Sequence, residues 1–391
     1  MDAPEGEFLL RDGVVEGARE RCSAPVHALA SAGGSRVQVR LLDWPADRSA
    51  RLDLVDFSGR VVGQQSGVRV DDAVVFTHPW SGEVLLRIVS EDPDAPANNY
   101  ALSHTCVAAC DLAYTRYPLF LMHGMAGTDA WLDVVTYWFG IEPHLESLGF
   151  RVEAPAVDPF QGPEVRARQW REHLDALLST GEVRQVHLLG HSQGGLDARF
   201  VASQLDPMHQ VRTVTTVGTP NNGTAVADAV LGLVDDRLIT EWLLDEVVNA
   251  YADWVGAPSE QDLLEQLDAM SRPGMAVFNA EVLDRPDVDY FSWAGRTCAV
   301  LDLLCQAGNG GEAVFVPLAP TFWLLELLEG SNDGLVSVQS AQWGEFLGVI
   351  PADHMNEVGH LVGETAPGFD HLKFWADEAW RLANWERDAV D

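Results

Sequence analysis

The feature that most constrains this 391-residue chain is a glycine-flanked serine between an apolar run and a helical stretch. Residues 190–194 read Gly-His-Ser-Gln-Gly; they follow the run 186–189 and precede a helical pattern that includes Leu196. Small residues beside Ser192 permit a tight strand-to-helix turn, and such a turn projects the hydroxyl above the sheet. The segment therefore predicts a nucleophilic Ser192, in preference to a chance glycine-rich turn.

A base and an acid are expected farther along the chain. A serine hydroxyl needs a base that is held by a third group, and the order serine, acid, histidine accompanies this kind of turn. Asp333 lies in the turn Ser-Asn-Asp-Gly-Leu-Val, and His354 follows on a later loop. We therefore expect Ser192, Asp333 and His354 to form a catalytic triad. The competing histidines are interpreted as structural or surface residues: His123, His360 and His371.

A second glycine-containing loop, 123–127, directly follows the apolar run 117–122. At the end of a strand such a loop can direct a backbone N–H at a developing oxyanion. We expect the N–H groups of Met125 and of Gln193, the residue after the serine, to form the oxyanion hole. The position of His123 in this loop favours a structural role over that of a base.

The pattern of apolar residues and turns changes near residue 112. Residues 1–112 alternate short β-rich runs with turns, which predicts a small antiparallel sandwich. Residues 113–391 alternate apolar strands with helices, which predicts a parallel sheet covered on both faces. The strands expected are 36–42, 51–57, 83–89, 117–122, 186–189 and 211–217, and the helices 131–148 and 163–178. The sandwich is interpreted as a stabilising or accessory domain, with carbohydrate or surface attachment as the alternative.

The charge balance excludes some partners. A formal net charge of −34, with no basic patch, repels nucleic acid phosphates and anionic membranes. Solubility explains this charge more simply than a salty habitat does. No run of about twenty apolar residues that could span a membrane is present.

Cysteine spacing bears on the compartment. Cys106 with Cys110 and Cys298 with Cys305 are close pairs that could form short disulfide loops, which leaves Cys22 over. Such pairs favour an oxidising compartment. The first residues lack a signal peptide, so the protein is either cytoplasmic or secreted with its signal removed, and we favour secretion.

Five segments together resemble one enzyme family. They are 117–129, 190–195, 214–220, 290–295 and 332–336, and they occur in this order. The chain is similar over most of 115–360 to secreted triacylglycerol lipases of the Pseudomonas–Burkholderia–Proteus type. The resemblance implies an α/β-hydrolase core with the triad and oxyanion residues named above, and no organic cofactor. Ordinary members of that family lack the N-terminal sandwich.

The same resemblance implies a lid and a metal. The helical insertion 225–270 corresponds to the lid that opens at an oil–water surface, although a fixed core helix is the alternative. A structural calcium ion is expected near the histidine loop, and calcium prefers carboxylates. Here Asn356 occupies an expected carboxylate position, His360 supplies the backbone carbonyl, and Asp302 is the partner carboxylate. Because one carboxylate is missing, the resemblance leaves calcium binding open.

The function expected is hydrolysis of acylglycerol esters through an acyl-enzyme at an oil–water interface. The nearest alternative is a carboxylesterase or aliphatic-polyester hydrolase with the same triad. A non-catalytic protein that binds lipid or a surface is the alternative from another class. Some relatives need a dedicated folding chaperone, and the sequence leaves both this need and the oligomeric state open.

Overall fold

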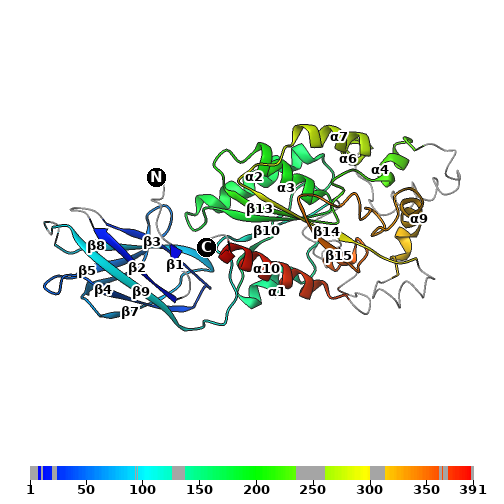
Figure 1. Ribbon diagram of the computed structural model, residues 1–391. Helices are drawn as coiled ribbons and strands as arrows, with labels where there is room; N and C mark the ends of the chain where they lie inside the picture. The colour runs from blue at the N-terminus through cyan, green and yellow to red at the C-terminus, as the bar shows by residue number, and fades with distance from the viewer. Residues whose placement is uncertain are drawn as a thin grey trace.

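The computed structural model describes two structural parts of the chain (Figure 1). Among the described residues, the N-terminal part has strands and no helix, whereas strands and helices alternate in the C-terminal part, and the two parts lie side by side. The described residues are 8–9, 12–19, 24–92, 94, 96–125, 137–234, 260–299, 313–360, 363 and 369–388.

The N-terminal part forms two sheets. Their strands are β1 (Phe8–Leu9), β2 (Asp12–Arg19), β3 (Val26–Ser31), β4 (Arg36–Asp43), β5 (Ala50–Val55), β6 (Val61–Val68), β7 (Ala73–Thr77), β8 (Gly82–Ser90) and β9 (Asn98–Ala108). One sheet has the order β1-β3-β8-β5-β6 and the other β2-β9-β4-β7. Apart from the parallel β1–β3 pair, neighbouring strands are antiparallel. The sandwich expected from the turn-rich pattern is thereby confirmed.

Alternation along the strands builds the sandwich core. In β4, Val37, Val39 and Leu41 are buried, while the intervening residues are more exposed. Leu52 of β5 and Leu86 of β8 join the same apolar cluster from the facing sheet. Successive side chains of a strand point to opposite faces, so this period of two places one face of each sheet in the core.

The C-terminal part contains a six-stranded sheet of order β11-β10-β12-β13-β14-β15, in which all pairs are parallel. Its strands are β10 (Leu119–Met122), β11 (Val152–Glu153), β12 (Val186–His191), β13 (Val211–Val217), β14 (Asp289–Gly295) and β15 (Glu345–Ile350). The described helices are α1 (Ile141–Leu148), α2 (Pro163–Ser179), α3 (Gln193–Gln204), α4 (Ala225–Val230), α6 (Glu260–Met270), α7 (Arg272–Glu281), η1 (Val316–Leu318), α9 (Ala319–Leu328), η2 (Asn356–Val358) and α10 (His371–Asp388).

Helices cover both faces of this sheet (Figure 1). In β10, Leu119 and Leu121 belong to the apolar cluster that includes residues of α1 and α10. Phe120 and Met122 of the same strand belong to the cluster that includes residues of α2 and α3. A strand that is buried on both faces reads as a continuous apolar run rather than an alternating one, which explains the sequence of β10.

The sandwich docks on the parallel sheet where its strands begin. Glu83 of β8 is buried and accepts hydrogen bonds from Arg116 (2.9 Å) and Arg184 (2.8 Å), which precede β10 and β12. Ser81 donates a hydrogen bond of 2.5 Å to the carbonyl of Gly149, just before β11. The opposite edge of the sheet, where parallel strands carry their functional groups, is therefore left clear of these contacts.

The expected elements are found with small shifts at their ends. The run 117–122 becomes a strand only from Leu119, and the helix expected at 163–178 extends to Ser179. Within 131–148, residues 131–136 lie outside the described residues, and the helix there begins at Ile141. Of the expected lid, only α4 and α6 with the few residues beside them are described; residues 235–259 lie outside.

The disulfide between Cys106 and Cys110 is confirmed, with the two Cα atoms 5.9 Å apart. Cys298 is disulfide-bonded as well, but Cys305 and Cys22 lie outside the described residues. None of the described helices is long and apolar enough to cross a bilayer. Lys373 is the single lysine of the sequence; its side chain is 70% exposed on α10 and pairs with Asp377.

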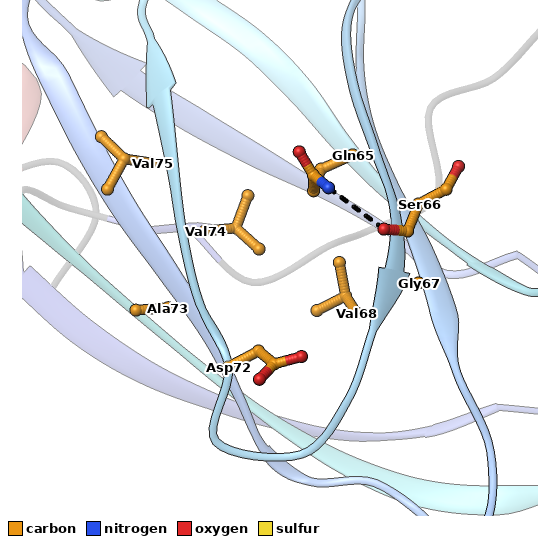
Figure 2. A pocket seen from close by; sticks show the side chains of 8 residues that line it. All are labelled: Gln65, Ser66, Gly67, Val68, Asp72, Ala73, Val74 and Val75. Atoms are coloured by element: carbon orange, nitrogen blue, oxygen red, sulfur yellow. Dashed lines mark hydrogen bonds between the residues drawn. The ribbon is translucent and has the colours of Figure 1, made fainter.

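A shallow polar pocket of about 320 Å³ opens on the sandwich around β6 and β7 (Figure 2). Gln65 and Asp72 are its main polar side chains, and Gln65 donates to the carbonyl of the neighbouring Ser66. No histidine, cysteine or aromatic residue lines it. The pocket is thus separate in place and in chemistry from Ser192, on the other part of the chain.

Candidate active site

Ser192 occupies the turn between β12 and α3 in a strained backbone conformation. Its φ and ψ are 56° and −132°, a region that residues with a side chain rarely adopt and that is retained mainly at functional sites. The serine is the N-cap residue of α3, so the positive end of the helix dipole faces the reacting centre. The geometry is that of a nucleophile elbow.

The glycines around the serine are required by close packing. A Cβ on Gly190 would lie 2.4 Å from the carbonyl oxygen of Gly194, and one on Gly194 would lie 2.0 Å from that of Met122. A Cβ on Gly195 would lie 2.1 Å from the hydroxyl of Thr219. Any side chain at these positions would force the turn open, which explains the glycine-rich sequence.

His354 joins Ser192 to Asp333 by hydrogen bonds. The serine Oγ lies 2.9 Å from His354 Nε2, and His354 Nδ1 lies 2.7 Å from Asp333 Oδ2. Asp333 Oδ1 accepts further hydrogen bonds from the backbone N–H groups of Leu335 and Val336, at 2.8 and 2.7 Å. The carboxylate selects the tautomer with a proton on Nδ1, so Nε2 is left to accept the serine proton.

These three residues come from distant parts of the chain and are all buried. Asp333 lies on the turn after α9, and His354 follows β15. The backbone N–H of His354 also donates to the carbonyl of Asp333 at 2.9 Å. Backbone and side chain together therefore fix the imidazole against the carboxylate, as expected for a base and its orienting acid.

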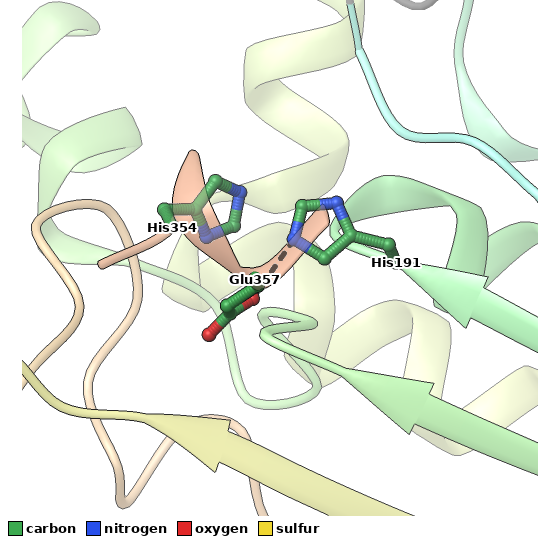
Figure 3. Close-up of side chains that lie close together, drawn as sticks. All are labelled: His191, His354 and Glu357. Atoms are coloured by element: carbon green, nitrogen blue, oxygen red, sulfur yellow. Dashed lines mark hydrogen bonds and ion pairs between the residues drawn. The ribbon is translucent and has the colours of Figure 1, made fainter. Parts of the chain in front are cut away.

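A second buried chain of hydrogen bonds lies beside the first (Figure 3), and sequence reasoning did not find it. The Tyr137 hydroxyl donates to His191 Nδ1 at 2.6 Å, and His191 Nε2 donates to Glu357 at 2.8 Å. The His191 and His354 rings are 4.8 Å apart. Burial, and then the neighbouring His354, hold the pKa of His191 well below its usual value, so His191 stays neutral.

Space for Glu357 is left by two glycines at the ends of neighbouring strands. A Cβ on Gly218, after β13, or on Gly295, in β14, would lie 2.1 or 2.0 Å from a Glu357 carboxylate oxygen. The fold explains these two glycines, but nothing in the sequence alone links them to Glu357. His191, His354 and Glu357 lie close enough to hold a metal ion, but both His191 nitrogens and the Nε2 and Nδ1 of His354 already serve protein hydrogen bonds.

The predicted oxyanion loop lies directly against Ser192. A Cβ on Gly124 would lie 2.7 Å from the Cβ of Ser192, and the next residue, Met125, is buried. His123 Nδ1 donates to the Gly124 carbonyl at 2.8 Å, while its Nε2 accepts from the N–H of Val157 at 3.0 Å. Burial, with the charge of Arg166, lowers the pKa of His123 to about 3. A neutral, doubly bonded His123 agrees with the structural role expected for it.

The Gln193 side chain is also held. Its amide donates to the Gln161 carbonyl at 2.8 Å and accepts from Gln266 of α6 at 2.5 Å. Gln266 is fully buried and also donates to the Pro159 carbonyl at 3.1 Å. The residue that follows the serine is thereby fixed by the segment before α2 and by the first helix after the undescribed part of the insertion; sequence reasoning did not single out Gln266.

The expected calcium ligands are not assembled by the described residues. Asp302 lies outside them, and Asn356 is a buried residue of η2. Calcium binds through hard oxygens, usually with carboxylates among them. In the described loop, the Asp353 carboxylate accepts from backbone N–H groups and that of Glu357 from His191. Of the expected ligands, only Asn356 and His360 are described, and neither supplies a carboxylate.

Comparison with known proteins identifies the fold and the family of the chain. Residues 117–290 match the family model described as alpha/beta hydrolase fold. The triacylglycerol lipase of Burkholderia plantarii is 30% identical over 304 residues, which cover 67% of this chain and 84% of the relative. The chain belongs to the triacylglycerol lipase family. A further lipase, from Pseudarthrobacter phenanthrenivorans, is 30% identical over 64% of this chain and 91% of its own.

Solved structures support the fold of the lipase. Staphylococcus hyicus lipase matches 70% of this chain and 97% of its own with a TM-score of 0.50. At 17% identity that likeness concerns the fold alone. The lipase is thus an ester hydrolase with an α/β-hydrolase fold preceded by an all-β region. Membership of an enzyme family disfavours the alternative of an inert binding protein.

Proposed function

We propose that Ser192 is the nucleophile of this lipase, with His354 as its base and Asp333 as the residue that orients His354. The observation that carries the proposal is the continuous hydrogen-bond chain from Ser192 Oγ through His354 to Asp333, at 2.9 and 2.7 Å. The serine proton passes to His354 Nε2 as Oγ attacks the ester carbonyl. Asp333 stabilises the imidazolium, which then protonates the leaving alcohol.

The oxyanion formed in this step is assigned to the backbone N–H groups of Met125 and Gln193. The loop with Met125 packs against Ser192, and Gln193 opens α3 directly after it. Fixed donors at the place where negative charge develops stabilise the transition state more than the substrate. Water then attacks the acyl-enzyme, with His354 again as the base, and releases the carboxylic acid.

Long-chain acylglycerols are the proposed substrates. The apolar cluster beside the site includes Met125, Leu196, Phe322 and Leu335. These side chains are buried against one another, so an acyl chain would have to enter among them, and the apolar area that it removes from water would favour binding at about 25 cal/mol per Å². The insertion 225–270 is proposed as the lid of the site, and its described helices α4 and α6 contribute Val226 and Leu267 to this cluster.

A soluble carboxylesterase or polyester hydrolase with the same triad is the second candidate, and chain-length preference separates the two. We would measure hydrolysis of p-nitrophenyl esters from acetate to palmitate by the wild type and Ser192→Ala. Rates that rise toward long chains, with turnover of triglyceride emulsions, support a lipase, and rates confined to short chains support the esterase. If Ser192→Ala kept the wild-type rate, the proposed mechanism would be wrong.

Further proposals concern the whole protein. Residues 1–112 and 113–391 are proposed as an accessory and a catalytic domain. Disulfide bonds at Cys106, Cys110 and Cys298 support a secreted protein, because such bonds persist in oxidising compartments. Refolding of the denatured chain alone, with recovery of full activity, would argue against a dedicated folding chaperone.

Calcium stays a prediction from the resemblance, with Asp302, Asn356 and the His360 carbonyl as ligands. An ion that binds only the folded state raises stability by mass action. A calcium-dependent rise in the thermal unfolding midpoint, reversed by EDTA and lost in Asp302→Ala, would support the site. Equal midpoints with calcium and with EDTA would dismiss it.

A further inference from the structure

Helix α2 carries a buried arginine whose side chain reaches both halves of the proposed site. Arg166 is 0% exposed, and its Nε donates to Asp197 at 2.7 Å. One terminal nitrogen donates to the carbonyl of Asp158 at 2.9 Å, and the other donates to the carbonyl of His123. Asp197 belongs to α3, the helix that Ser192 caps, whereas His123 opens the loop that contains Met125.

Asp197 holds the arginine from the nucleophile side. Its carboxylate is 0% exposed and accepts hydrogen bonds from Arg166 and from the indole N–H of Trp170, at 2.7 and 3.0 Å. Burial raises the pKa of Asp197 to about 6, a rise that the Arg166 charge and both hydrogen bonds oppose. Above pH 6 the residue is therefore mainly a carboxylate, and the guanidinium has its counter-ion on α3.

The carbonyl that Arg166 binds belongs to the peptide next to the proposed donor. The His123–Gly124 peptide is fixed by Arg166, and the Gly124–Met125 peptide is fixed at its oxygen by His123 Nδ1. A trans peptide is planar, with its N–H and C=O pointing in opposite directions. Holding both oxygens therefore sets the direction of the Met125 N–H, and donors that are fixed in advance need no reorganisation during reaction.

We propose that Arg166 is a positioning residue that fixes the oxyanion loop relative to Ser192, with Asp197 orienting Arg166. This inference rests on the proposed role of the Met125 N–H. The guanidinium is needed because it donates in three in-plane directions at once, to Asp197, Asp158 and His123. A lysine ammonium is a compact charge that cannot span the three acceptors in that geometry.

The test compares Arg166→Lys and Asp197→Asn with the wild type on soluble p-nitrophenyl butyrate. A displaced oxyanion donor weakens the transition state alone, so kcat should fall about 100-fold in Arg166→Lys and about 10-fold in Asp197→Asn. KM should change by less than about twofold. Active-site titration with a phosphonate, allowed to reach completion, corrects each rate for the fraction of folded enzyme.

A second readout isolates the oxyanion hole. An alkylboronic acid adds the Ser192 oxygen to boron while His354 takes the proton, which gives a tetrahedral anion resembling the transition state. Its affinity should fall in each variant by about the same factor as kcat/KM, whereas the affinity for a long-chain alcohol, which has no oxyanion, should be unchanged. A merely structural role would leave the ratio of the two affinities as in the wild type.

Two control variants are matched to these changes. Arg168→Lys alters the exposed arginine two positions away on the same helix, whose side chain is 64% exposed, and should leave kcat and both affinities unchanged. Glu83→Gln breaks a buried ion pair at the domain contact and should lower stability without changing the affinity ratio. An affinity ratio in Arg166→Lys and Asp197→Asn equal to that of Glu83→Gln would overturn the inference.

Failure of the proposed mechanism gives a different result. If Ser192 were not the nucleophile, the wild type itself would not bind the boronic acid in a Ser192-dependent way. If the wild type and Ser192→Ala differ as expected but the Arg166 and Asp197 variants keep the wild-type affinity ratio, the mechanism stands and the positioning role is wrong.

Discussion

Buried carboxylates have different roles at the two edges of the parallel sheet, where its strands begin and where they end. At the edge where the strands begin, Glu83 from the sandwich pairs with Arg116 and Arg184, and the pairing holds two parts of the chain together. At the edge where the strands end, Asp333 pairs with His354 and the pairing is directed at Ser192. A buried carboxylate thus holds two parts of the chain together when its partners are arginines of the other part. It orients a side chain of the proposed site when its partner is a histidine beside Ser192.

We expect the largest effect on activity from removing the carboxylate charge of Asp333, at the edge where the strands end. Asp333→Asn keeps an oxygen that can accept from Leu335 and Val336, so the fold should persist, but the tautomer of His354 is no longer selected. We expect kcat to fall about 10⁴-fold at pH 8, measured on p-nitrophenyl butyrate. Asp206→Asn is the control, because Asp206 is buried before β13 and accepts from backbone N–H groups. An equal loss of kcat in both variants would contradict the comparison.

Glu83→Gln should affect stability and leave chemistry alone. The change leaves Arg116 and Arg184, which are 11% and 34% exposed, without their common carboxylate. We expect the free energy of unfolding, measured in urea, to fall by about 2 kcal/mol, which is less than for a fully buried pair because Arg184 is partly solvated. The kcat per titrated active site should not change. Glu182→Gln, at a more exposed contact with Arg60, should cost less than about 1 kcal/mol.

Acid should lower the stability of the folded protein through the buried histidines near the edge where the strands end. Burial, and then the charge of His354, lower the pKa of His360 to about 3, whereas an unfolded histidine titrates near 6.5. Between these values the unfolded chain binds the proton and the native protein does not, so stability falls as the pH falls from about 6.5 toward 3. His123 and His191 act in the same direction. Each histidine contributes about 1.4 kcal/mol per pH unit.

One variant isolates this contribution. The free energy of unfolding of His360→Gln and of the wild type would be measured in urea between pH 7.5 and 4.5. Below pH 6.5 the wild type should lose about 1.4 kcal/mol more per pH unit than the variant. Asp197 acts in the opposite sense, because its raised pKa makes the native state the better proton acceptor between about pH 4 and 6. Parallel curves for His360→Gln would refute the assignment.

The smallest effect on stability is expected from the loss of a single hydrogen bond at the edge where the strands begin and the sandwich docks. Ser81→Ala removes the bond to the Gly149 carbonyl and the acceptor for the Gly33 N–H. A loss of about 1 kcal/mol is expected, with unchanged kcat. Ser90→Ala, at the end of β8, removes an exposed hydrogen bond to the Asp92 carbonyl and should change stability by less than about 0.5 kcal/mol. A change in kcat for Ser81→Ala would mean that the two edges are coupled.

The sequence predicted those features that depend on residues close together in the chain. The turn at Ser192 is visible because a buried strand, three glycines and a helix follow one another within a short segment. Asp333 and His354 followed from the chain order, and the structure places both within hydrogen-bond distance of their partners. The alternation along β4 and the continuous apolar run of β10 correctly separated the antiparallel from the parallel sheet.

Features that depend on distant pairing were missed. Nothing near Glu357 or Tyr137 in the sequence indicates that both would bind His191. Arg166 did leave a signal, because it shares the buried face of α2 with Trp170, Leu174 and Leu177 at helical spacing. An arginine on such an apolar stripe must find polar partners inside the protein, but only the fold shows that one of them is the oxyanion loop.

The solitary Lys373 has a practical consequence. Its side chain is 70% exposed on α10, and no other lysine occurs in the sequence. Amine-reactive supports attach most proteins through many lysines and so in many orientations. This enzyme offers one lysine side chain besides the terminal amino group, so side-chain coupling would tether it in a single orientation. Lys373→Arg would remove that attachment point while the charge on the helix is kept.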